Sequence, residues 1–156
     1  MTTTLAAPAM APDFTIARDG GGHITLRDFR GKKLVLYFYP KADTPGCTQE
    51  SIEFSALRAS FASAGTEVIG VSADPVKAQD AFKAKHGLTV ALGSDSTHAM
   101  LKAYGVWGEK SMYGKTFMGI VRTTFLIGTD GRIVRVWSNV KVKGHAAAVL
   151  AAAQAI

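Results

Sequence analysis

Short runs of apolar residues, separated by turn sequences, predict a series of β-strands. Two segments around Asp19-Gly20-Gly21-Gly22 alternate apolar and polar residues, which predicts an antiparallel hairpin. Another run is continuously apolar, as is typical of a strand covered on both faces. A Gly-Thr-Asp-Gly turn predicts a second hairpin near the C-terminal end. The expected strands are residues 14–16, 23–26, 34–39 (the continuous run), 67–72, 90–92, 123–127 and 133–137.

Apolar residues at helical spacing predict the helices. In the longest of them, Phe54, Leu57 and Phe61 occupy positions i, i+3 and i+7 and form one apolar face. At roughly 100° per residue, Ile52 points about 160° away from Phe54, so it lies off that face. Residues 108–119 show no clear period, and we expect a loop there. The helices are expected at residues 47–63, 77–86, 95–104 (capped by Asp95-Ser96) and 144–156.

Strands that alternate with helices and end in an antiparallel pair indicate an α/β fold. We predict three layers, with a mixed central sheet flanked by helices and a hairpin at the N-terminal end. The length of 156 residues favours a single domain. Residues 1–12 are rich in Thr, Ala and Pro and are expected to form a loose arm, so the domain should cover residues 13–156.

The composition excludes several kinds of site. A single cysteine excludes an intramolecular disulfide, a Cys-x-x-Cys redox pair and a four-cysteine zinc or iron–sulfur site within one chain. Lys and Arg outnumber Asp and Glu by 18 to 12, but the cations are scattered, so we do not expect nucleic-acid binding. No apolar run reaches the roughly 18 residues that span a bilayer, and residues 1–12 lack the pattern of a secretory signal. A free thiol then suggests a cytoplasmic protein without a membrane partner.

Cys47 follows the continuously apolar strand and stands at the expected start of a helix. Unpaired N–H groups and the helix dipole at such a position favour the thiolate over the thiol. Thr44 lies three residues earlier, across a tight Pro45-Gly46 turn, and can direct its hydroxyl toward the sulfur. The site also lies at the carboxyl edge of the sheet, where α/β proteins bind ligands. A lone cysteine is more often an inert buried residue, but this context favours a reactive thiol.

The histidines do not suggest a metal site. Their spacing is not that of metal ligands, so we expect neither a metal nor another cofactor. A Cys–His hydrolase would need a histidine beside Cys47, and nothing in the sequence places one there. We expect surface or helix-end positions for His23, His86, His98 and His145.

The spacing of Pro40, Thr44 and Cys47 reproduces the Pro-x-x-x-Thr-x-x-Cys motif of the peroxiredoxins. Residues 43–50, Asp-Thr-Pro-Gly-Cys-Thr-Gln-Glu, resemble the PrxQ branch, also called bacterioferritin comigratory protein. The resemblance runs from about residue 11 to the end of the chain, and it implies a thioredoxin-like fold and a thiol-dependent peroxidase. Further matches in the same order are residues 70–72, 104–107, 108–115, 122–127 and 141–145.

The resemblance also implies roles for individual residues. Cys47 would be the peroxidatic cysteine, and Thr44 would bind the peroxide oxygen and the thiolate. Pro40 would shield the pocket, and Arg122 would complete it. A permanent guanidinium charge, a hydroxyl and helix N–H groups suit attack on an O–O bond, because they stabilise the thiolate and the departing oxygen. Without the resemblance, Arg122 would be assigned to the surface, as most arginines are.

Three further residues are candidates near the thiol. Tyr39, beside Pro40, and Gly46 are expected to line the substrate pocket, although aromatic residues more often belong to the core. Glu50 lies in the first helical turn, where it either supports the helix dipole or orients the site. Residues 110–117 carry aromatic and Met side chains among cations, and they either form a lid over the site or cover the sheet edge.

The chain departs from the PrxQ pattern after the first chemical step. Many PrxQ proteins carry a resolving cysteine five residues beyond the peroxidatic one, where this chain has Ile52. Ile52 would be exposed, as a displaced resolving residue would be, or covered by a neighbouring loop. With no second cysteine in the chain, the sulfenic acid would react with an external thiol or with Cys47 of another subunit. We therefore predict a one-cysteine peroxidase that acts on hydrogen peroxide or organic hydroperoxides. Its reductant would be thioredoxin, glutathione with glutaredoxin, or another small thiol.

Two other classes of function use the same residues. Oxidation of Cys47 would also suit a peroxide sensor or a redox-regulated chaperone, in which the oxidised state changes partner binding. An inactive thioredoxin-like binding module is a third hypothesis, and the combination of Thr44, Cys47 and Arg122 argues against it. Because the PrxQ branch is often monomeric, we expect a monomer or a weak homodimer.

Overall fold

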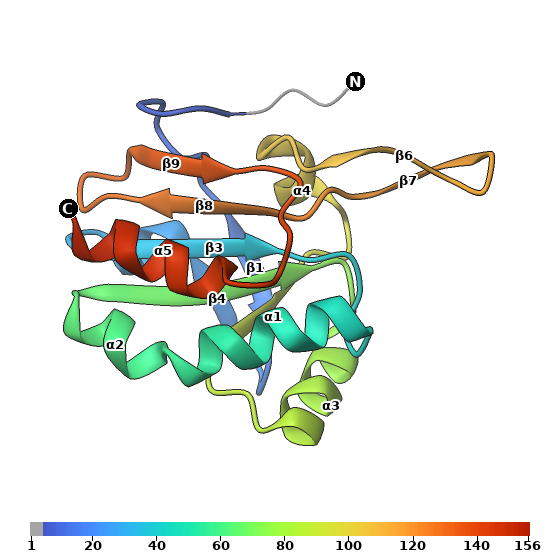
Figure 1. The fold of residues 1–156 in the computed structure, drawn as a ribbon, viewed down its shortest axis with the longest axis horizontal. Coiled ribbons are helices and arrows are strands. Elements are labelled where there is room, and N and C mark those ends of the chain that lie inside the picture. Colours follow the sequence, from blue (N-terminus) through green and yellow to red (C-terminus); the bar gives the residue numbers. More distant parts are fainter. Residues whose placement is uncertain (1–4) are drawn as a thin grey trace.

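The computed structural model describes residues 5–156 and contains a seven-stranded mixed sheet with helices on both faces (Figure 1). In spatial order the strands are β2 (His23–Thr25), β1 (Thr15–Arg18), β5 (Ala91–Ser94), β4 (Thr66–Ser72), β3 (Lys33–Phe38), β8 (Thr123–Ile127) and β9 (Ile133–Trp137). The three central strands β5, β4 and β3 are parallel, and β8 and β9 continue the sheet in antiparallel pairing. At the other edge, β1 and β2 form the expected N-terminal hairpin.

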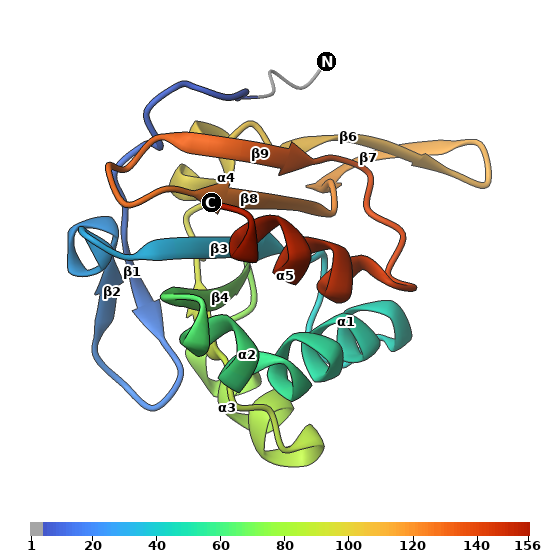
Figure 2. The same ribbon diagram turned by 60° about the vertical axis from the view of Figure 1, so that its left-hand side comes forward.

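Helices on the two faces of the sheet make the outer layers (Figures 1 and 2). Successive side chains of a strand point to opposite faces, so β3 supplies two separate cores: Val35 and Tyr37 lie in one, and Leu36 and Phe38 lie in the other. All four side chains are fully buried. The three-layer α/β prediction is therefore confirmed. The first core is covered by α1 (Pro45–Ala56), α2 (Arg58–Ser63), α3 (Val76–His86) and α5 (His145–Gln154), and the second by α4 (Ala99–Ala103) and the 3-10 helix Leu26–Phe29.

Two helix predictions need correction. The helix expected over residues 47–63 is broken at Leu57, whose ψ of 2° leaves the helical range and separates α1 from α2. The helix expected from Asp95 to Tyr104 begins only at Ala99, because His98 adopts a left-handed conformation with φ 67°. Asp95 still caps it from a distance, since its carboxylate accepts the backbone N–H of Leu101 at 2.8 Å.

The loop expected at residues 108–119 is wrong, because this segment is a β-hairpin. Strands β6 (Trp107–Met112) and β7 (Lys115–Ile120) pair with each other and join no strand of the main sheet. Tyr113 and Gly114 connect them, with φ of 53° and 75°, as the two-residue turn of a tight hairpin requires. The hairpin projects from the body of the molecule (Figures 1 and 2). This projection explains the missing period, since neither face of the hairpin is buried along its length.

Residues 9–11 lie beside the turn between β8 and β9. Residues 1–4, part of the expected loose arm, lie outside the described residues. Met10 forms a β-bridge with Arg132, and the N–H of Ala11 donates to the carbonyl of Gly131 at 2.9 Å. Among the described residues, no helix is both long enough and apolar enough to cross a bilayer.

Substitution of Gly70 by Ala should loosen the layer behind the thiol site. A Cβ added to Gly70 would lie 2.5 Å from the ring of Tyr37, and that ring is stacked on Phe54 and bonded to Ser51 through its hydroxyl. We expect Gly70→Ala to lower the free energy of unfolding by about 1–3 kcal/mol in urea titrations. Combination with Tyr37→Leu should recover part of this loss, and strictly additive effects would contradict the proposed clash.

Candidate active site

The end of β3 and the start of α1 position the thiol. β3 ends at Phe38, and a loop leads to Thr44, which has extended backbone angles and is the N-cap of α1. Pro45 occupies the first helical position, where its fixed φ and missing N–H are tolerated. Cys47 is thus in the first turn, where backbone N–H groups have no partner within the helix. Its side chain is only 1% exposed.

Arg122 contacts both Cys47 and Glu50. From the segment just before β8, its Nη2 donates to Cys47 Sγ at 3.3 Å, and its Nη1 donates to Glu50 Oε1 at 2.7 Å. The Arg122 side chain is 17% exposed and that of Glu50 is 1% exposed. Without the family resemblance, Arg122 would have been assigned to the surface. The structure contradicts that assignment, since the side chain is largely buried. The structure brings the three side chains together, while their catalytic roles stay predictions.

Burial and the shared guanidinium set the charges of this cluster. Burial raises the pKa of Glu50 to about 7, although Arg122 opposes the shift. Burial alone would lower the pKa of Arg122, but Glu50 and Cys47 raise it above its usual value. The second oxygen of Glu50, Oε2, has no hydrogen-bond partner among the described residues. One guanidinium therefore contacts both Glu50 and Cys47.

His145 occupies an expected helix-end position, but its burial was not predicted. It is the first residue of α5, a helix end as expected, but it is only 7% exposed. Its Nε2 lies 2.8 Å from the hydroxyl of Thr124, two residues beyond Arg122 on β8. Burial, aided by Arg122, lowers the pKa of His145 to about 4, so its ring is neutral at pH 7. This contact joins α5 to the strand that follows Arg122.

The other expected pocket residues differ in their burial and in their contacts. Thr44 is partly buried, and its hydroxyl donates to the carbonyl of Lys41 at 2.8 Å instead of to the sulfur. Gly46 lies under Arg122, since an added Cβ would be 3.2 Å from Nη2. Pro40 is partly buried, whereas Tyr39 is fully buried in the same core as Cys47. The hydroxyl of Tyr39 donates to Gln79 at 2.6 Å, away from the surface.

The polar contacts that hold the loop between β3 and α1 were not predicted. Asp43 adopts φ 62° and accepts from Lys85 at 2.8 Å, and its other oxygen lies 2.7 Å from His86 Nε2. The hydrogen bonds to His86 and Lys85 lower the pKa of Asp43. The N–H of Ala42 donates to Asp74 at 2.8 Å. These contacts join residues about 30–40 positions apart. The only signal for them in the sequence is an acidic residue in this loop and basic residues at the end of a distant helix.

Ile52 lies on the outer side of α1. It is 43% exposed, which agrees with its position off the apolar helix face. Together with Pro45, Thr48 and His86 it lines a shallow groove between α1 and the end of α3. The alternative that a neighbouring loop covers Ile52 does not hold.

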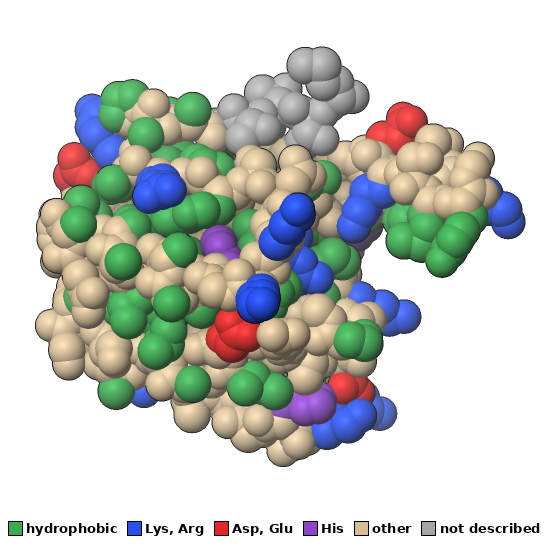
Figure 3. All heavy atoms as spheres, viewed as in Figure 1, with side chains coloured by type: hydrophobic (Ala, Val, Ile, Leu, Met, Phe, Trp, Pro, Cys, Tyr) green, Lys and Arg blue, Asp and Glu red, His purple; other side chains and the backbone are tan. Residues whose placement is uncertain are grey.

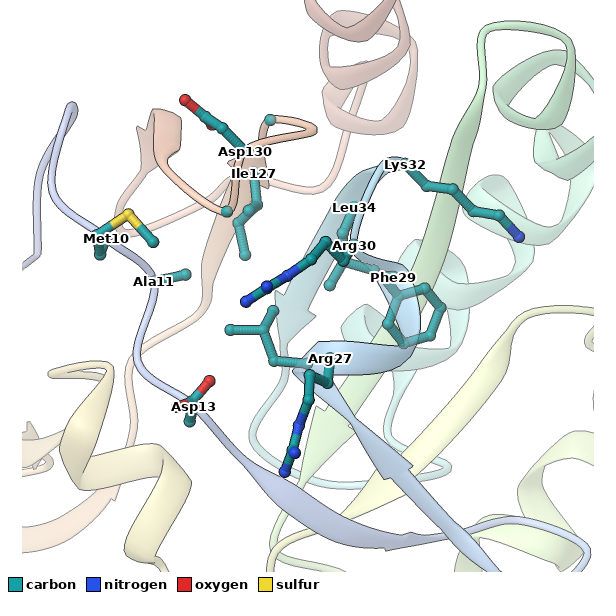
Figure 4. Close-up of a pocket in the computed structure, with 13 residues that line it drawn as sticks. Met10, Ala11, Asp13, Arg27, Phe29, Arg30, Lys32, Leu34, Ile127 and Asp130 are labelled. Carbon is teal, nitrogen blue, oxygen red and sulfur yellow. The ribbon is translucent and has the colours of Figure 1, made fainter.

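A separate cavity of about 240 Å³ lies at the start of β3 (Figure 4). Leu34 and Ile127 line it, and the side chains of Asp13 and Arg30 come from different walls. Because Cys47 follows the opposite end of β3, this cavity is not part of the thiol site.

Comparison with known proteins assigns the chain to a family. Residues 8–136 match the AhpC/TSA family. Peroxiredoxin Bcp of Xanthomonas campestris pv. campestris is 48% identical over 151 residues, which cover 97% of this chain and 94% of that protein. The chain is a peroxiredoxin of the AhpC/TSA family. Peroxiredoxin Bcp of Bacillus subtilis is 44% identical over 147 residues, 94% of each protein.

Solved peroxiredoxin structures share the whole fold. Peroxiredoxin Q of Xanthomonas campestris has a TM-score of 0.88 and 45% identity, covering 99% of this chain and 97% of that one. The bacterioferritin comigratory protein of the same organism, solved to study its alkyl peroxide reduction activity, has a TM-score of 0.88 and 44% identity over 99% and 98% of the two chains. The thioredoxin-like fold and the PrxQ branch are therefore confirmed. This peroxiredoxin is a thiol-dependent peroxidase with a peroxide substrate and a thiol reductant.

Removal of the Arg122 side chain should slow the reaction of Cys47 with peroxide. We expect Arg122→Ala to lower the second-order rate with hydrogen peroxide by about 10²–10³-fold, because a charged donor beside the sulfur is lost. Arg135→Ala, which removes an exposed cation stacked on Trp137, is the matched control. Equal rates for Arg122→Ala and the control would contradict this role.

Glu50 and His145 should change stability with pH in opposite directions. The pKa of Glu50 rises from 4.5 to about 7 on folding, so its contribution to stability falls as pH rises between about 4.5 and about 7. The pKa of His145 falls from 6.5 to about 4, so its contribution is lost as pH drops from about 6.5 to about 4.

Two substitutions separate these titrations. Glu50→Gln should make stability rise more steeply with pH in this window, and His145→Asn should make it fall more steeply. Urea unfolding at a series of pH values measures both slopes. Slopes equal to those of the unsubstituted chain would show that neither group titrates as described.

Proposed function

We propose that this peroxiredoxin reduces hydrogen peroxide and organic hydroperoxides through a sulfenic acid on Cys47. The Cys47 thiolate attacks one peroxide oxygen, an S–O bond forms and the O–O bond breaks. The departing hydroxide or alkoxide takes up a proton and leaves as water or alcohol. The observation that carries the proposal is the 3.3 Å contact from Arg122 Nη2 to Cys47 Sγ. The alkyl peroxide reduction activity of the Xanthomonas campestris relative supports the organic substrates.

The surroundings of the sulfur suit this step. Arg122 holds a positive charge beside both the thiolate and the oxygen that leaves, and the first-turn N–H groups of α1 add donors. We assign Thr44 to hydrogen bonding with the bound peroxide, after its hydroxyl turns from Lys41. Pro40, Gly46 and the ring of Tyr39 form the walls. Because Cys47 is almost completely buried, small peroxides are favoured over bulky ones.

The second half of the cycle depends on an external thiol. The sequence holds one cysteine, and Ile52 occupies the position of the usual resolving residue. A reductant thiol attacks the sulfenic sulfur, an S–S bond forms and water leaves, and a second thiol then releases Cys47. Thioredoxin, or glutathione with glutaredoxin, supplies these thiols in a reducing cytoplasm. The enzyme acts as a monomer or weak homodimer, and residues 13–156 form its single domain.

Substitution of the nucleophile tests the proposal. Cys47→Ser should abolish peroxide consumption, because a serine hydroxyl is not ionised at neutral pH. In the unsubstituted chain, mass spectrometry after one equivalent of peroxide should show Cys47 with one added oxygen, trapped by a sulfenic-acid reagent. Turnover that survives in Cys47→Ser would contradict the proposal. Reaction no faster than that of free cysteine at the same pH would favour a peroxide sensor or redox-regulated chaperone instead.

A further inference from the structure

The β6–β7 hairpin exposes an apolar surface that the chain itself does not cover. Its main apolar side chains are more than 40% exposed, and it pairs with no strand of the main sheet. Exposed apolar groups gathered on one projecting element indicate a binding surface. Figure 3 shows apolar side chains along the hairpin, above a hollow between it and the body. Met112 (56% exposed) and Phe117 (45%) share one face, Tyr113 (96%) stands in the turn, and Met118 (52%) lies on the opposite face.

The backbone conformation of the hairpin turn is unfavourable for Tyr113. Tyr113 has φ 53°, a conformation in which a bulky side chain costs about 1 kcal/mol or more and Asn or Gly is preferred. No hydrogen bond or ring contact of Tyr113 with the described residues offsets this cost. An exposed aromatic ring at a strained position therefore contributes nothing to the fold. Its contribution is expected from a contact outside the chain.

One face of the hairpin is directed toward the thiol site. Lys110 and Phe117 are opposite each other in the register and share the face with Met112 and Lys115. The side chains of Lys110 and Phe117 pack over Gly119, where an added Cβ would lie 3.0 Å and 3.5 Å from them. Burial lowers the pKa of Lys110, and so does Arg122. Lys110 Nζ donates to the carbonyl of Ile120 at 2.9 Å, two residues before Arg122, so the base of this face lies beside the segment that carries Arg122.

Positive charge surrounds the hollow below the hairpin. Lys110 and Lys115 belong to the hairpin face, and the exposed Lys141 and Lys143 follow β9. The N–H of Val140 donates to the carbonyl of Arg122 at 3.0 Å, which holds this lysine segment beside the site.

The carboxylates nearby do not offset this charge. Glu109 points to the opposite face of the hairpin, where it pairs with Met118. Glu50 is bound to Arg122, and Asp43 is bound to Lys85 and His86. The surface presented to a partner is thus apolar and cationic.

We propose that residues 110–118 are the docking surface for the protein that reduces Cys47. This inference rests on the proposed function, in which the reducing thiols come from outside the chain. The partner that fits is a dithiol protein whose reactive cysteines lie in an apolar surface bordered by acidic side chains. The apolar face holds the partner over the hollow, and the lysines attract its acidic border.

Hairpin variants test the docking directly. Cys47 is converted to a mixed disulfide with thionitrobenzoate, and release of the chromophore by thioredoxin, by glutaredoxin and by dithiothreitol is followed separately. Tyr113→Asn should lower the second-order rate with one of the two proteins about tenfold, as expected for an aromatic anchor. The dithiothreitol rate and the rate of Cys47 oxidation by peroxide should not change. The unfolding midpoint of Tyr113→Asn should stay the same or rise, since Asn tolerates the turn.

Matched variants define the surface. Phe117→Ser should act like Tyr113→Asn, and Tyr113→Phe should retain the rate because the ring remains. Lys115→Glu should slow the protein reductant most at low salt, because salt screens the attraction. Val134→Ser removes an exposed apolar side chain on β9, outside the hairpin, and should have no effect.

Several outcomes would overturn the docking proposal. One is equal protein-reductant rates for Tyr113→Asn, Phe117→Ser and Val134→Ser. Another is a rate with dithiothreitol that falls as much as the rate with the protein reductant, which would show that the substitution alters the thiol site itself. A third is a higher KM for organic hydroperoxides alone, which would make the hairpin a substrate-tail site. A fourth is a homodimer that Tyr113→Asn dissociates, which would make the occupant a second copy. Because the mixed disulfide is made without peroxide, failure of the peroxidase proposal would be seen independently.

Discussion

The contact between the Arg122 guanidinium and the Cys47 sulfur is the constraint on which the site depends. The two residues are 75 positions apart, and they meet because β8 pairs antiparallel with β3 and α1 begins directly beyond the end of β3. Gly46 leaves room for this approach, since an added Cβ would lie 3.2 Å from Nη2. A sheet of this order places a cation beside the first turn of α1. The fold thereby brings a guanidinium to the only cysteine of the sequence.

That one guanidinium also limits how much negative charge the site can hold. Glu50 and Cys47 both accept a hydrogen bond from the Arg122 guanidinium. Burial makes the neutral form of Glu50 accessible near pH 7. The unpaired Oε2 is consistent with this balance, since a protonated or weakly ionised carboxyl needs fewer donors. His145 stays neutral at pH 7 mainly because it is buried, and the charge of Arg122 adds to this effect. The single positive charge of Arg122 therefore balances one negative charge in this cluster.

The sequence predicted those features that depend on local pattern. The continuous apolar run at residues 34–39 and the motif from Pro40 to Cys47 were enough to place a thiol between a buried strand and a helix. The burial of His145 and the polar contacts of Asp43 were not predicted, because both arise from contacts between distant segments. The β6–β7 hairpin was missed for another reason. A hairpin exposed on both faces has no need for alternating apolar residues, so its sequence carries no period.

The single thiol changes what the rest of the surface must do. In a chain with its own resolving cysteine, the first disulfide forms at an effective concentration of about millimolar, independent of any partner. With Ile52 at that position, the partner must itself reach a sulfur that is 1% exposed. A reductant at roughly micromolar concentration would then react about a thousandfold more slowly unless contacts elsewhere hold it in place. In the proposed docking, the β6–β7 hairpin supplies such contacts through exposed apolar side chains that share a face with Lys110 and Lys115.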